Sequence, residues 1–390
     1  MQLLYISNGN IPSRWAHTVQ IMKMSEAFAR IVPGFSLLIP GSLRGGVPGG
    51  DLPAADLFAW YGITRPFRLR RLPMAWRLAP AMLDRSNWRQ FSSRARYYTW
   101  LARPRLIMTR CHESADYALR DRFPVIFETH DGPGHPKTMD AIAAFARRPT
   151  LAGVVTTSEV LKDAFCAAGL RPEQVLAIPN AVDLDRFELE DGARAAARRA
   201  LGVAPDDFLV VYTGSLKPYK GIGTLVEAAR LRPRYRFVTV GGSAEEIAGW
   251  EAQAADCRNL ELRPFVPNRE LPRYLAAADA CLVPNSASDR TASWTFSLKL
   301  YEYLAAGRPV VASDIPSLRS AVADGVEALL VPPDDAQALV AALDRLHDEP
   351  ALAARLAAAG RRKVAEITWD RRARLVIDTF APGLATRGEP

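Results

Sequence analysis

The stretch from Ser297 to Asp314 reads SLKLYEYLAAGRPVVASD and predicts a helix that ends in a turn before a strand. Its apolar residues recur at helical spacing, at Leu298, Leu300, Tyr301, Leu304 and Ala305. Glycine adopts the left-handed backbone that commonly ends a helix, and Gly307 stands at that point. Pro309 then opens a β-branched run, so we expect a helix, its cap and a strand in that order.

The start of this predicted helix has the residue types of an anion-binding site. Ser297 can cap the helix, and the free backbone N–H groups there favour an anion together with the helix dipole. Lys299 lies in the first turn, where a cation is unfavourable unless a phosphate is bound. Glu302 lies about one turn further along the same side, and its carboxylate can accept hydrogen bonds from two neighbouring hydroxyls. A nucleotide-sugar carries both groups that these residues could bind, a diphosphate and a ribose diol. Alternatively, the stretch is an ordinary amphipathic helix with a glutamate on its surface.

The same stretch resembles the nucleotide-sugar motif of the family 4 glycosyltransferases, which have the GT-B fold. A Glu-x7-Glu pair is common in that family, and its second glutamate grips the ribose. Glu302 matches the second glutamate, but Trp294 stands at the position of the first. The stretch is instead similar to a subgroup in which Ser-x-Lys precedes the glutamate. The resemblance therefore implies that a nucleotide-sugar contacts Ser297, Leu298, Lys299 and Glu302.

The length and composition of the chain predict a protein of two domains. Its 390 residues suffice for two hydrophobic cores. No apolar run reaches the roughly 18 residues of a membrane span, and residues 1–8 lack the features of a signal peptide. We therefore expect a cytoplasmic protein, which could also bind peripherally to the inner face of the membrane.

Cysteine spacing and net charge bear on the cofactors and partners. The cysteines are widely spaced and lack histidines at the spacing of metal ligands; they are Cys111, Cys166, Cys257 and Cys281. They predict reduced thiols, and we expect neither a metal nor any other cofactor. The net charge of +8 and the pI near 9.4 imply an anionic partner, which could be a nucleic acid, a nucleotide or an acidic membrane.

The first half of the chain has the pattern of a Rossmann-like domain. Short apolar runs are separated by helix-length segments, as a parallel sheet requires, at 3–7, 106–109, 125–128 and 153–157. The first run is followed by a glycine-containing loop and then by a predicted helix from about Thr18 to Arg30. In the GT-B pattern, which this opening also resembles, the first loop lies beside the donor phosphate and the acceptor. That implies roles for Gly9, Ser13 and His17, although a plain turn would give the same sequence.

Polar residues follow the predicted strand at 125–128, in the string ETHDGPGHP. The carboxyl end of a strand is the usual place for polar chemistry in an open α/β sheet, and the string carries Glu128, His130, Asp131 and His135. The resemblance implies that His130 faces the sugar-bearing carbon of the donor. Alternatively, His130 caps the next helix. The spacing predicts no zinc site.

The segment from Arg65 to Arg105 holds eleven arginines against one acidic residue, together with three tryptophans. Arginine interleaved with aromatic residues suits a surface of anionic lipid headgroups. It also suits single-stranded nucleic acid, through stacking, or a solvated basic face whose aromatic residues lie in the core. We favour an anionic membrane and expect no nucleic acid, because acceptors in the family that the chain resembles are often lipid-linked. The preceding residues 41–55, rich in glycine and proline, predict a mobile connection.

The second half of the chain repeats the strand, loop and helix unit, so two Rossmann-like halves are expected in tandem. The run FLVVYTG at 208–214 is followed by the loop SLKPYKG at 215–221. Lys217 and Lys220 can each place an ammonium on a diphosphate. In the family that the chain resembles, an arginine follows the first glycine and a lysine precedes the next. Lys220 matches that lysine, whereas Ser215 occupies the arginine position and leaves Lys217 as a substitute.

Further positions in the second half follow from the resemblance. The main chain around Phe265 and Val266 would hold the nucleotide base, and the polar loop that contains Ser293 would reach the donor sugar. Asp183 and Asp185 form a D-x-D pattern, the metal motif of the other major glycosyltransferase fold. We reject that interpretation because the flanking residues predict a turn into a linker. Added EDTA separates the two interpretations, because a D-x-D enzyme would lose activity.

The fold expected from these features is an α/β GT-B fold of two Rossmann-like domains that face each other across a cleft. Residues 1–185 would form the acceptor domain, with residues 368–390 crossing back to pack on it. Residues 186–367 would form the nucleotide-sugar donor domain. These boundaries follow the family junction signature that the string VLAIPNAVDLDRF resembles.

The resemblance implies a metal-independent, retaining glycosyltransferase that moves a hexosyl group from a nucleoside-diphosphate-sugar to a hydroxyl acceptor. The acceptor would be a lipid-linked or cell-surface glycan precursor, as in polysaccharide biosynthesis. His130, Lys220 and Glu302 are the expected catalytic residues, and the sequence shows no carboxylate pair of the kind that a retaining glycoside hydrolase uses. Two alternatives stay open: a nucleotide-sugar epimerase of the same fold, and a non-enzymatic protein that binds RNA or membranes.

Overall fold

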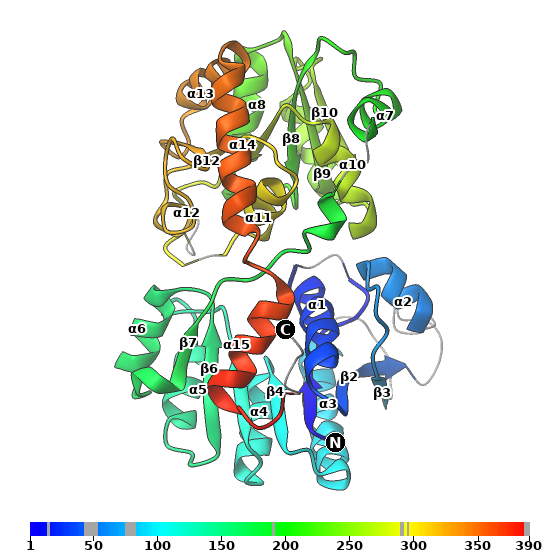
Figure 1. Ribbon diagram of the computed structural model, residues 1–390, viewed down its shortest axis with the longest axis vertical. Coiled ribbons are helices and arrows are strands. Elements are labelled where there is room, and N and C mark those ends of the chain that lie inside the picture. The colour runs from blue at the N-terminus through cyan, green and yellow to red at the C-terminus, as the bar shows by residue number, and fades with distance from the viewer. Residues whose placement is uncertain are drawn as a thin grey trace. The chain divides into compact units, whose positions relative to one another are not determined.

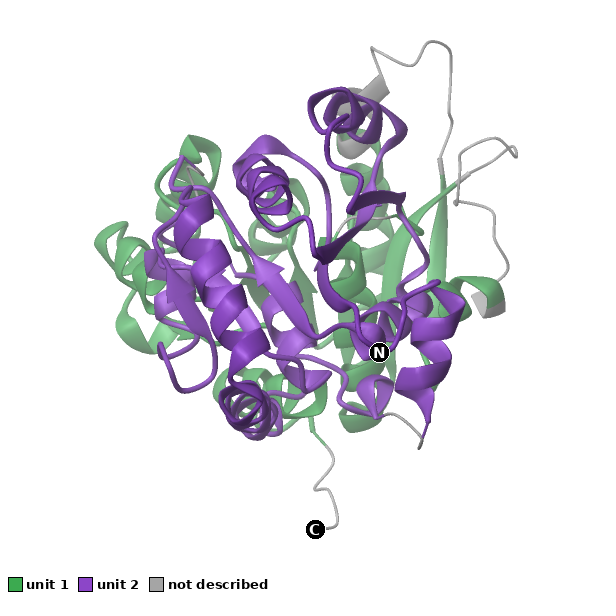
Figure 2. Ribbon diagram, turned by 90° about the horizontal axis from the view of Figure 1, so that it is seen from above, with its two compact units in different colours: residues 1–180, 369–390 green, residues 181–368 purple. Residues whose placement is uncertain are grey.

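The computed structural model describes residues 1–13, 16–42, 54–74, 83–188, 192–288, 292–294 and 296–385. The chain divides into two compact units, residues 1–180 with 369–390 (unit 1) and residues 181–368 (unit 2), which Figure 2 shows in different colours. Most of the connection predicted at 41–55 lies outside the described residues, as do residues 75–82 of the arginine-rich segment. Unit 2 begins at Ala181, so the expected boundary at 185/186 lies inside it. The N–H of Val182 donates to the carbonyl of Ile367 (3.0 Å), which ties the start of this unit to its end.

Unit 1 is built on a parallel sheet, which has seven strands within the described residues (Figure 1). The strand order is β3-β2-β1-β4-β5-β6-β7. The strands are β1 (Leu3–Ile6), β2 (Phe35–Ser42), β3 (Leu69–Met74), β4 (Leu106–Thr109), β5 (Val125–Glu128), β6 (Leu151–Thr156) and β7 (Val175–Ala177). β1, β4 and β5 are buried along their whole length, as expected when helices cover both faces of a parallel sheet. The predicted strands at 106–109 and 125–128 coincide with β4 and β5.

Helices connect these strands in the βα pattern. They are α1 (Ala16–Ile31), α2 (Ala54–Tyr61), α3 (Leu83–Ala102), α4 (His112–Arg120), α5 (Pro136–Phe145), α6 (Glu159–Ala167) and the 3-10 helix η1 (Pro172–Gln174). The strand order reverses direction between β1 and β4. In open α/β sheets, ligands bind at such a switch point, outside the carboxyl ends of the strands. The loops after β1 and β4 therefore lie at the expected binding edge of unit 1.

The last helix of the chain, α15 (Trp369–Phe380), belongs to unit 1 and packs beside α1 and against β6 (Figure 1). Arg30 of α1 pairs with Asp370 at 2.7 Å. The ring of Phe380 lies directly against Gly153 of β6, where an added Cβ would be 2.1 Å from the ring. Only glycine allows this close approach of a helix to the strand.

Unit 2 is built on a second parallel sheet, of six strands within the described residues, in the order β10-β9-β8-β11-β12-β13. The strands are β8 (Phe208–Thr213), β9 (Tyr235–Gly242), β10 (Leu260–Pro264), β11 (Ala280–Val283), β12 (Val310–Ser313) and β13 (Leu329–Val331). Successive residues of β8 enter different hydrophobic clusters, because helices cover both faces of the sheet: Leu209 and Val211 pack on one side, Val210 and Tyr212 on the other. The predicted α/β class is confirmed in both units.

The helices of unit 2 are α7 (Ala193–Ala200), α8 (Ile222–Leu231), α9 (Ala244–Gln253), α10 (Leu271–Ala277), α11 (Leu298–Ala305), α12 (Pro316–Arg319), α13 (Ala336–Asp348) and α14 (Pro350–Val364). Three 3-10 helices accompany them, η2 (Asp185–Phe187), η3 (Pro218–Lys220) and η4 (Asn268–Glu270). The switch point lies between β8 and β11. There the two following loops touch, since a Cβ on Gly221 (φ +75°) would lie 1.6 Å from the carbonyl oxygen of Pro284.

The stretch 297–314 folds as helix, turn and strand. α11 ends before Gly307, which has a left-handed φ of +60°, and β12 follows. Ser297 occupies the N-cap position of α11, as predicted, but its side chain accepts no capping hydrogen bond; the N–H of Leu300 donates to the Ser297 carbonyl (3.1 Å). Among the helices that the structure describes, none is both long and apolar enough to cross a bilayer.

Candidate functional site

In unit 2, the loop after β8 carries the lysines that the sequence singled out, and side chains from two neighbouring elements fix its backbone. The indole of Trp250 donates to the carbonyl of Leu216 (2.6 Å), whose own N–H donates to Glu246 (3.3 Å). The hydroxyl of Tyr212 donates to the carbonyl of Ser215 (2.8 Å). These bonds hold the backbone of the loop that carries Lys217 and Lys220.

Both lysines of this loop lie near the ring of Tyr219. The Nζ of Lys220 is 4.9 Å from the ring centroid and that of Lys217 is 5.9 Å from it. A lysine ammonium over a tyrosine ring is attracted by the negative face of the ring. Lys220 is also close enough to Lys299 of α11 to act on the pKa of that lysine.

Lys299 is buried at the start of α11. Its Nζ has no hydrogen-bond partner among the described residues and lies 3.7 Å from the centroid of the Tyr212 ring. Burial lowers the pKa of Lys299 well below its ordinary value, the charge of Lys220 lowers it further, and Glu302 opposes both. The ammonium occupies the space beside Gly214, where an added Cβ would be 2.8 Å from Nζ. The Lys299 side chain thus lies within the electrostatic influence of a second lysine, Lys220.

Glu302 follows one turn later on α11 and is only 16% exposed. Its Oε1 lies 4.0 Å from Nη1 of Arg186. Burial raises the pKa of Glu302 above its ordinary value; Arg186 and Lys299 oppose this shift, and Asp183 reinforces it. Lys220, Lys299 and Glu302 therefore belong to one electrostatic cluster, as the sequence pattern suggested.

Arg186 is a member of this cluster that the sequence did not reveal. It lies in η2 and donates to the backbone carbonyl of Asn268 (2.6 Å) as well as to the Asn268 side chain. Its segment had been interpreted only as a junction between domains. A signal was present, since arginine is the usual partner of a buried carboxylate, but the carboxylate in question lies far along the chain.

The remaining predicted positions of unit 2 lie around the same edge of the sheet. The N–H of Phe265 donates to the carbonyl of Gly242 (3.2 Å), and Val266 packs on the hydrophobic core. Ser297 and Leu298 at the start of α11 are half-buried, whereas Ser293 is exposed.

In unit 1, the loop after β1 is compact. The N–H of Gly9 donates to the Ser7 hydroxyl (3.1 Å), and an added Cβ on Gly9 would lie 3.6 Å from Nε2 of His17. Ser13 lies in a group of hydroxyls: its N–H donates to Tyr61 (2.8 Å) and its Oγ lies 3.0 Å from that of Thr18. These bonds give Ser13 a structural role in holding the loop, while Gly9 and His17 lie together at its surface.

His130 follows β5 and belongs to a buried polar network. Its Nε2 lies 3.3 Å from Oε1 of Glu128 and 3.3 Å from the side-chain nitrogen of Gln20. Burial lowers the pKa of His130 to about 4, assisted by Arg110 and opposed by Glu128, so the ring is neutral at pH 7. The alternative that His130 caps the next helix is wrong, because the residue at that position of α5 is His135.

The other bonds of this network fix the orientation of the Gln20 amide. Arg110 donates to Oε1 of Gln20, so the Gln20 nitrogen is the donor to Glu128 (2.5 Å). The Nε2 of His130 lies 3.3 Å from both the Glu128 carboxylate and the Gln20 nitrogen. In the tautomer that donates to the charged carboxylate, Nδ1 is left as the hydrogen-bond acceptor.

Glu128 is fully buried and is the centre of this network. Its Oε1 accepts a hydrogen bond from Arg372 of α15 (2.7 Å), and its Oε2 accepts one from Tyr5 (3.3 Å). Burial alone would raise the pKa of Glu128, but the His130 hydrogen bond and the charges of Arg372 and Arg110 hold it well below its usual range. Gln20, Arg110 and Arg372 were not predicted from the sequence. Within the described residues, no cluster of His, Cys, Asp and Glu has the makeup of a metal site.

Comparison with known proteins finds similarity to glycosyltransferases over part of the chain. Residues 207–349 match the family described as glycosyl transferases group 1. The D-inositol 3-phosphate glycosyltransferase of Geodermatophilus obscurus is 33% identical over 237 residues, which cover 56% of this chain and 49% of that protein. The enzyme of the same name from Xylanimonas cellulosilytica is 31% identical over 248 residues, 61% of this chain and 58% of that protein. The chain thus spans about half the length of the curated relatives that it matches.

Solved structures resemble the chain over nearly its whole length. Sucrose-phosphate synthase from Thermosynechococcus elongatus has a TM-score of 0.78 at 22% identity, covering 98% of this chain and all of that one (100%). Anabaena Alr3699/HepE in complex with UDP has a TM-score of 0.76 at 18% identity, with coverage of 98% and 100%. The fold is therefore GT-B, as the sequence predicted. Residues 207–349 are thus similar to the group 1 glycosyltransferases.

Proposed function

We propose that the protein transfers a sugar from a nucleoside-diphosphate-sugar to a hydroxyl acceptor, and that unit 2 binds the donor. The observation that carries this proposal is the buried ammonium of Lys299, which has no hydrogen-bond partner among the described residues and lies beside a second lysine, Lys220. A buried charge without a partner costs several kcal/mol. A diphosphate at the start of α11 would supply the missing partner, assisted by the helix dipole.

The rest of the donor fits the residues around this charge. Glu302 lies about one turn from Lys299 and would accept hydrogen bonds from the two ribose hydroxyls. Ser215, Lys217, Ser297 and Leu298 would line the diphosphate, and the main chain of Phe265 and Val266 would hold the base. Anabaena HepE, of similar fold, binds UDP and UDP-glucose, which supports a uridine nucleotide as the first donor to test.

The proposed chemistry breaks the bond between the anomeric carbon and the diphosphate oxygen and forms a bond from that carbon to the acceptor oxygen. The acceptor proton passes to the departing diphosphate, so that no protein base is consumed. Lys220 and Lys299 stabilise the charge on the leaving group, and we propose that the enzyme needs no metal ion for this purpose. His130 would hold the reacting sugar through Nδ1. Retention of the anomeric configuration is part of the proposal.

Assays of UDP-sugars with and without acceptor test the proposal. We expect UDP release to depend on a hydroxyl acceptor and the product to keep the donor configuration, with activity unchanged by EDTA. The acceptor series should contain lipid-linked glycan precursors, which we favour, and phosphorylated cyclitols, after which the curated relatives are named. Epimerised sugar formed from donor alone would instead establish the epimerase alternative. The absence of nucleotide-sugar binding would reject both.

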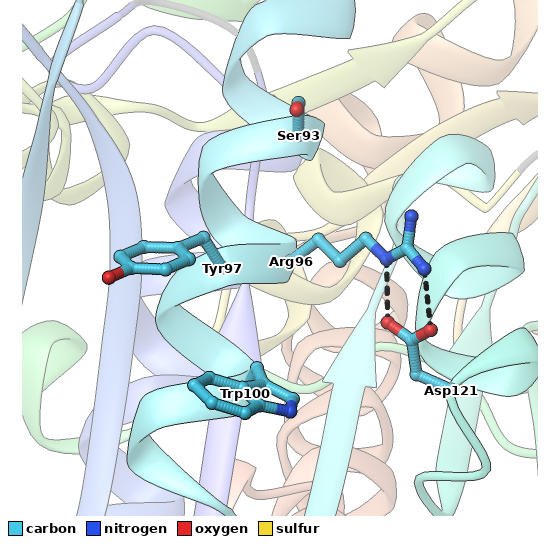
Figure 3. Close-up of a pocket in the computed structure, with 5 residues that line it drawn as sticks. All are labelled: Ser93, Arg96, Tyr97, Trp100 and Asp121. Atoms are coloured by element: carbon cyan, nitrogen blue, oxygen red, sulfur yellow. Dashed lines mark hydrogen bonds and ion pairs between the residues drawn. The ribbon is translucent and has the colours of Figure 1, made fainter.

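We further propose that the outer face of α3 contacts an anionic membrane, where a lipid-linked acceptor would lie. Three apolar side chains on this face are well exposed, Tyr97 (66%), Trp100 (55%) and Leu101 (58%). Figure 3 shows Tyr97 and Trp100 projecting from successive turns, whereas Arg96 turns to Asp121 at 2.7 Å. Together with Ser93 these residues line a hollow of about 470 Å³.

Arginines surround the exposed aromatic face. Arg103 lies 5.7 Å from the centroid of the Trp100 ring, and both Arg89 and Arg105 are exposed on the same segment. Guanidinium groups pair with lipid phosphates while tryptophan and tyrosine rings occupy the headgroup boundary. The exposed Leu101 favours a bilayer over single-stranded nucleic acid, which is bound by stacking rather than by aliphatic contact.

Sedimentation with lipid vesicles tests this surface. We expect the protein to pellet with vesicles rich in phosphatidylglycerol and to remain in solution with phosphatidylcholine alone. The double variant Tyr97→Ser, Trp100→Ser should lose most of this binding, whereas Val160→Ser, which removes an equally exposed apolar side chain (49%) from α6, should not. Equal binding by both variants, or binding to poly(U) alone, would reject the membrane contact.

A further inference from the structure

Arg372 of α15 is buried, with its residue 2% exposed, and it joins three parts of unit 1. Its Nη2 donates to Oε1 of Glu128 (2.7 Å) at the end of β5. Its Nη1 donates to the carbonyl of Ile178 (2.7 Å) and to that of Pro179 (3.0 Å), which follow β7. The guanidinium therefore fixes the end of β5, which leads directly into His130, against the last helix of the chain.

The geometry points to Arg372 and Glu128 as positioning residues that hold His130 in one orientation and in one tautomer. This inference rests on the role proposed above for His130. The oxygen of Glu128 that accepts from Arg372 is the same one that lies 3.3 Å from Nε2 of His130. A carboxylate held by a fixed guanidinium can accept the Nε2 proton in only one ring orientation, which leaves Nδ1 to accept a hydrogen bond from substrate.

The charges around His130 come from several elements. Arg110 follows β4, Glu128 ends β5 and Arg372 lies on α15, while the Tyr5 hydroxyl of β1 reaches the network through Glu128. Two guanidinium groups therefore face one carboxylate, and the excess of positive charge disfavours a protonated ring. Loss of Arg372 would remove one of these cations and leave Glu128 more available to stabilise the imidazolium.

Variants of the full-length chain test the inference through the pH dependence of kcat. If His130 acts in its neutral form, activity falls at low pH as the ring becomes protonated. In Arg372→Gln this acid limb should move up by about one pH unit or more, because a nearby opposite or like charge shifts a pKa by that amount. Arg372→Lys keeps the charge and should leave the limb in place while lowering kcat. The control Arg371→Gln removes an exposed arginine from the same helix and should match the wild type.

Nuclear magnetic resonance of the histidine rings tests the inference without an activity assay. We expect the His130 ring of the wild type to be the neutral Nε2–H tautomer at pH 7 and its pKa to rise in Arg372→Gln. A wild-type Nδ1–H tautomer would overturn the inference even where sugar transfer is established. In Arg372→Gln, a lower kcat with an unmoved acid limb and an unmoved ring pKa would show that Arg372 serves stability alone. If the wild type transfers no sugar, the proposed function fails, while the ring measurements still decide how His130 is held.

Discussion

At the scale of single residues, the buried ammonium of Lys299 favours the binding of an anion in unit 2. An ammonium that loses water and gains no hydrogen-bond acceptor shifts its pKa downward, and burial does so here with the help of Lys220. A bound diphosphate reverses that shift by supplying opposite charge. Ligand binding and protonation of Lys299 are therefore coupled: a bound diphosphate favours the protonated lysine.

UDP binding should take up protons. In the free protein the pKa of Lys299 is depressed, whereas in the complex the phosphate raises it. The complex consequently binds more protons between these two pKa values, and UDP affinity falls as pH rises through that interval. Calorimetric titration in two buffers of different ionisation enthalpy measures the uptake, and Lys299→Met should abolish it. The control Lys363→Met changes a lysine of the same unit that pairs with Glu327 (3.4 Å). Equal binding enthalpies in both buffers for the wild type would contradict the coupling.

Glu302 should form hydrogen bonds with the ribose hydroxyls. A hydrogen bond to a charged group contributes about 1.5–3 kcal/mol, which corresponds to roughly 10- to 150-fold in affinity. Wild-type protein should therefore bind UDP more tightly than 2′-deoxyuridine diphosphate, and Glu302→Ala should bind the two alike. Competition between the two nucleotides measures this ratio, and Glu251→Ala, on the exposed side of α9, should retain it. If Glu302→Ala keeps the wild-type ratio of the two affinities, the ribose does not bind at α11.

Sequence reasoning found the site residues that stand in a recognisable local string, such as Lys220 in its loop, and missed those that no local string marks. Lys299 and Glu302 share one helix, so their spacing could be recognised. Arg186 and Asn268 are 82 positions apart, and Arg372 and Glu128 are 244 apart. Nothing in the local pattern of an arginine in an amphipathic helix distinguishes a solvated side chain from one that is 2% exposed.

At the scale of elements, hydrophobic runs predicted the strands because a parallel sheet buries both faces of each strand. The buried strands β4 and β5 accordingly match their predicted limits. Helix starts were less predictable, since they depend on which hydroxyl or carbonyl meets which N–H group. Ser297 has the right residue type for a cap, but the N–H of Leu300 donates to its carbonyl.

Gly153 should prove essential for the packing of α15 on β6. An added Cβ would lie 2.1 Å from the Phe380 ring, so Gly153→Ala should cost about 1–3 kcal/mol of unfolding free energy through overpacking. Urea denaturation measures this loss. The matched control Gly249→Ala changes a glycine within α9 that has no atom within 4 Å of the added Cβ, and it should leave stability unchanged or raise it. The double variant Gly153→Ala, Phe380→Leu should recover part of the lost unfolding free energy. If the double variant is as unstable as Gly153→Ala alone, the loss arises in the strand and not from contact with the Phe380 ring.

At the scale of the whole molecule, unit 1 is discontinuous in sequence. The chain leaves it after Asn180, forms unit 2, and returns at Trp369 to add α15. The network around His130 therefore needs a residue from each end of the chain, and residues 1–180 alone lack Arg372. Composition and periodicity predict two αβ halves, but they do not predict that the chemistry of the first half depends on an arginine supplied after the second.

The same network should make the protein sensitive to mild acid. The pKa of His130 is about 4 when folded, against about 6.5 in an unfolded chain, so the unfolded state binds more protons between these values. Stability then decreases as pH falls from about 6.5 towards 4, and this group alone accounts for about 2 kcal/mol between pH 7 and pH 5. Glu128, whose folded pKa is depressed, adds a further loss only below its unfolded value of about 4.3, in the same direction. Urea unfolding at pH 7 and pH 5 measures the difference, which His130→Asn should reduce and His347→Asn, at an exposed ring of α13, should not. An equal pH effect in the wild type and His130→Asn would show that the pKa of His130 is the same in the folded and unfolded states, which would contradict the predicted acid sensitivity.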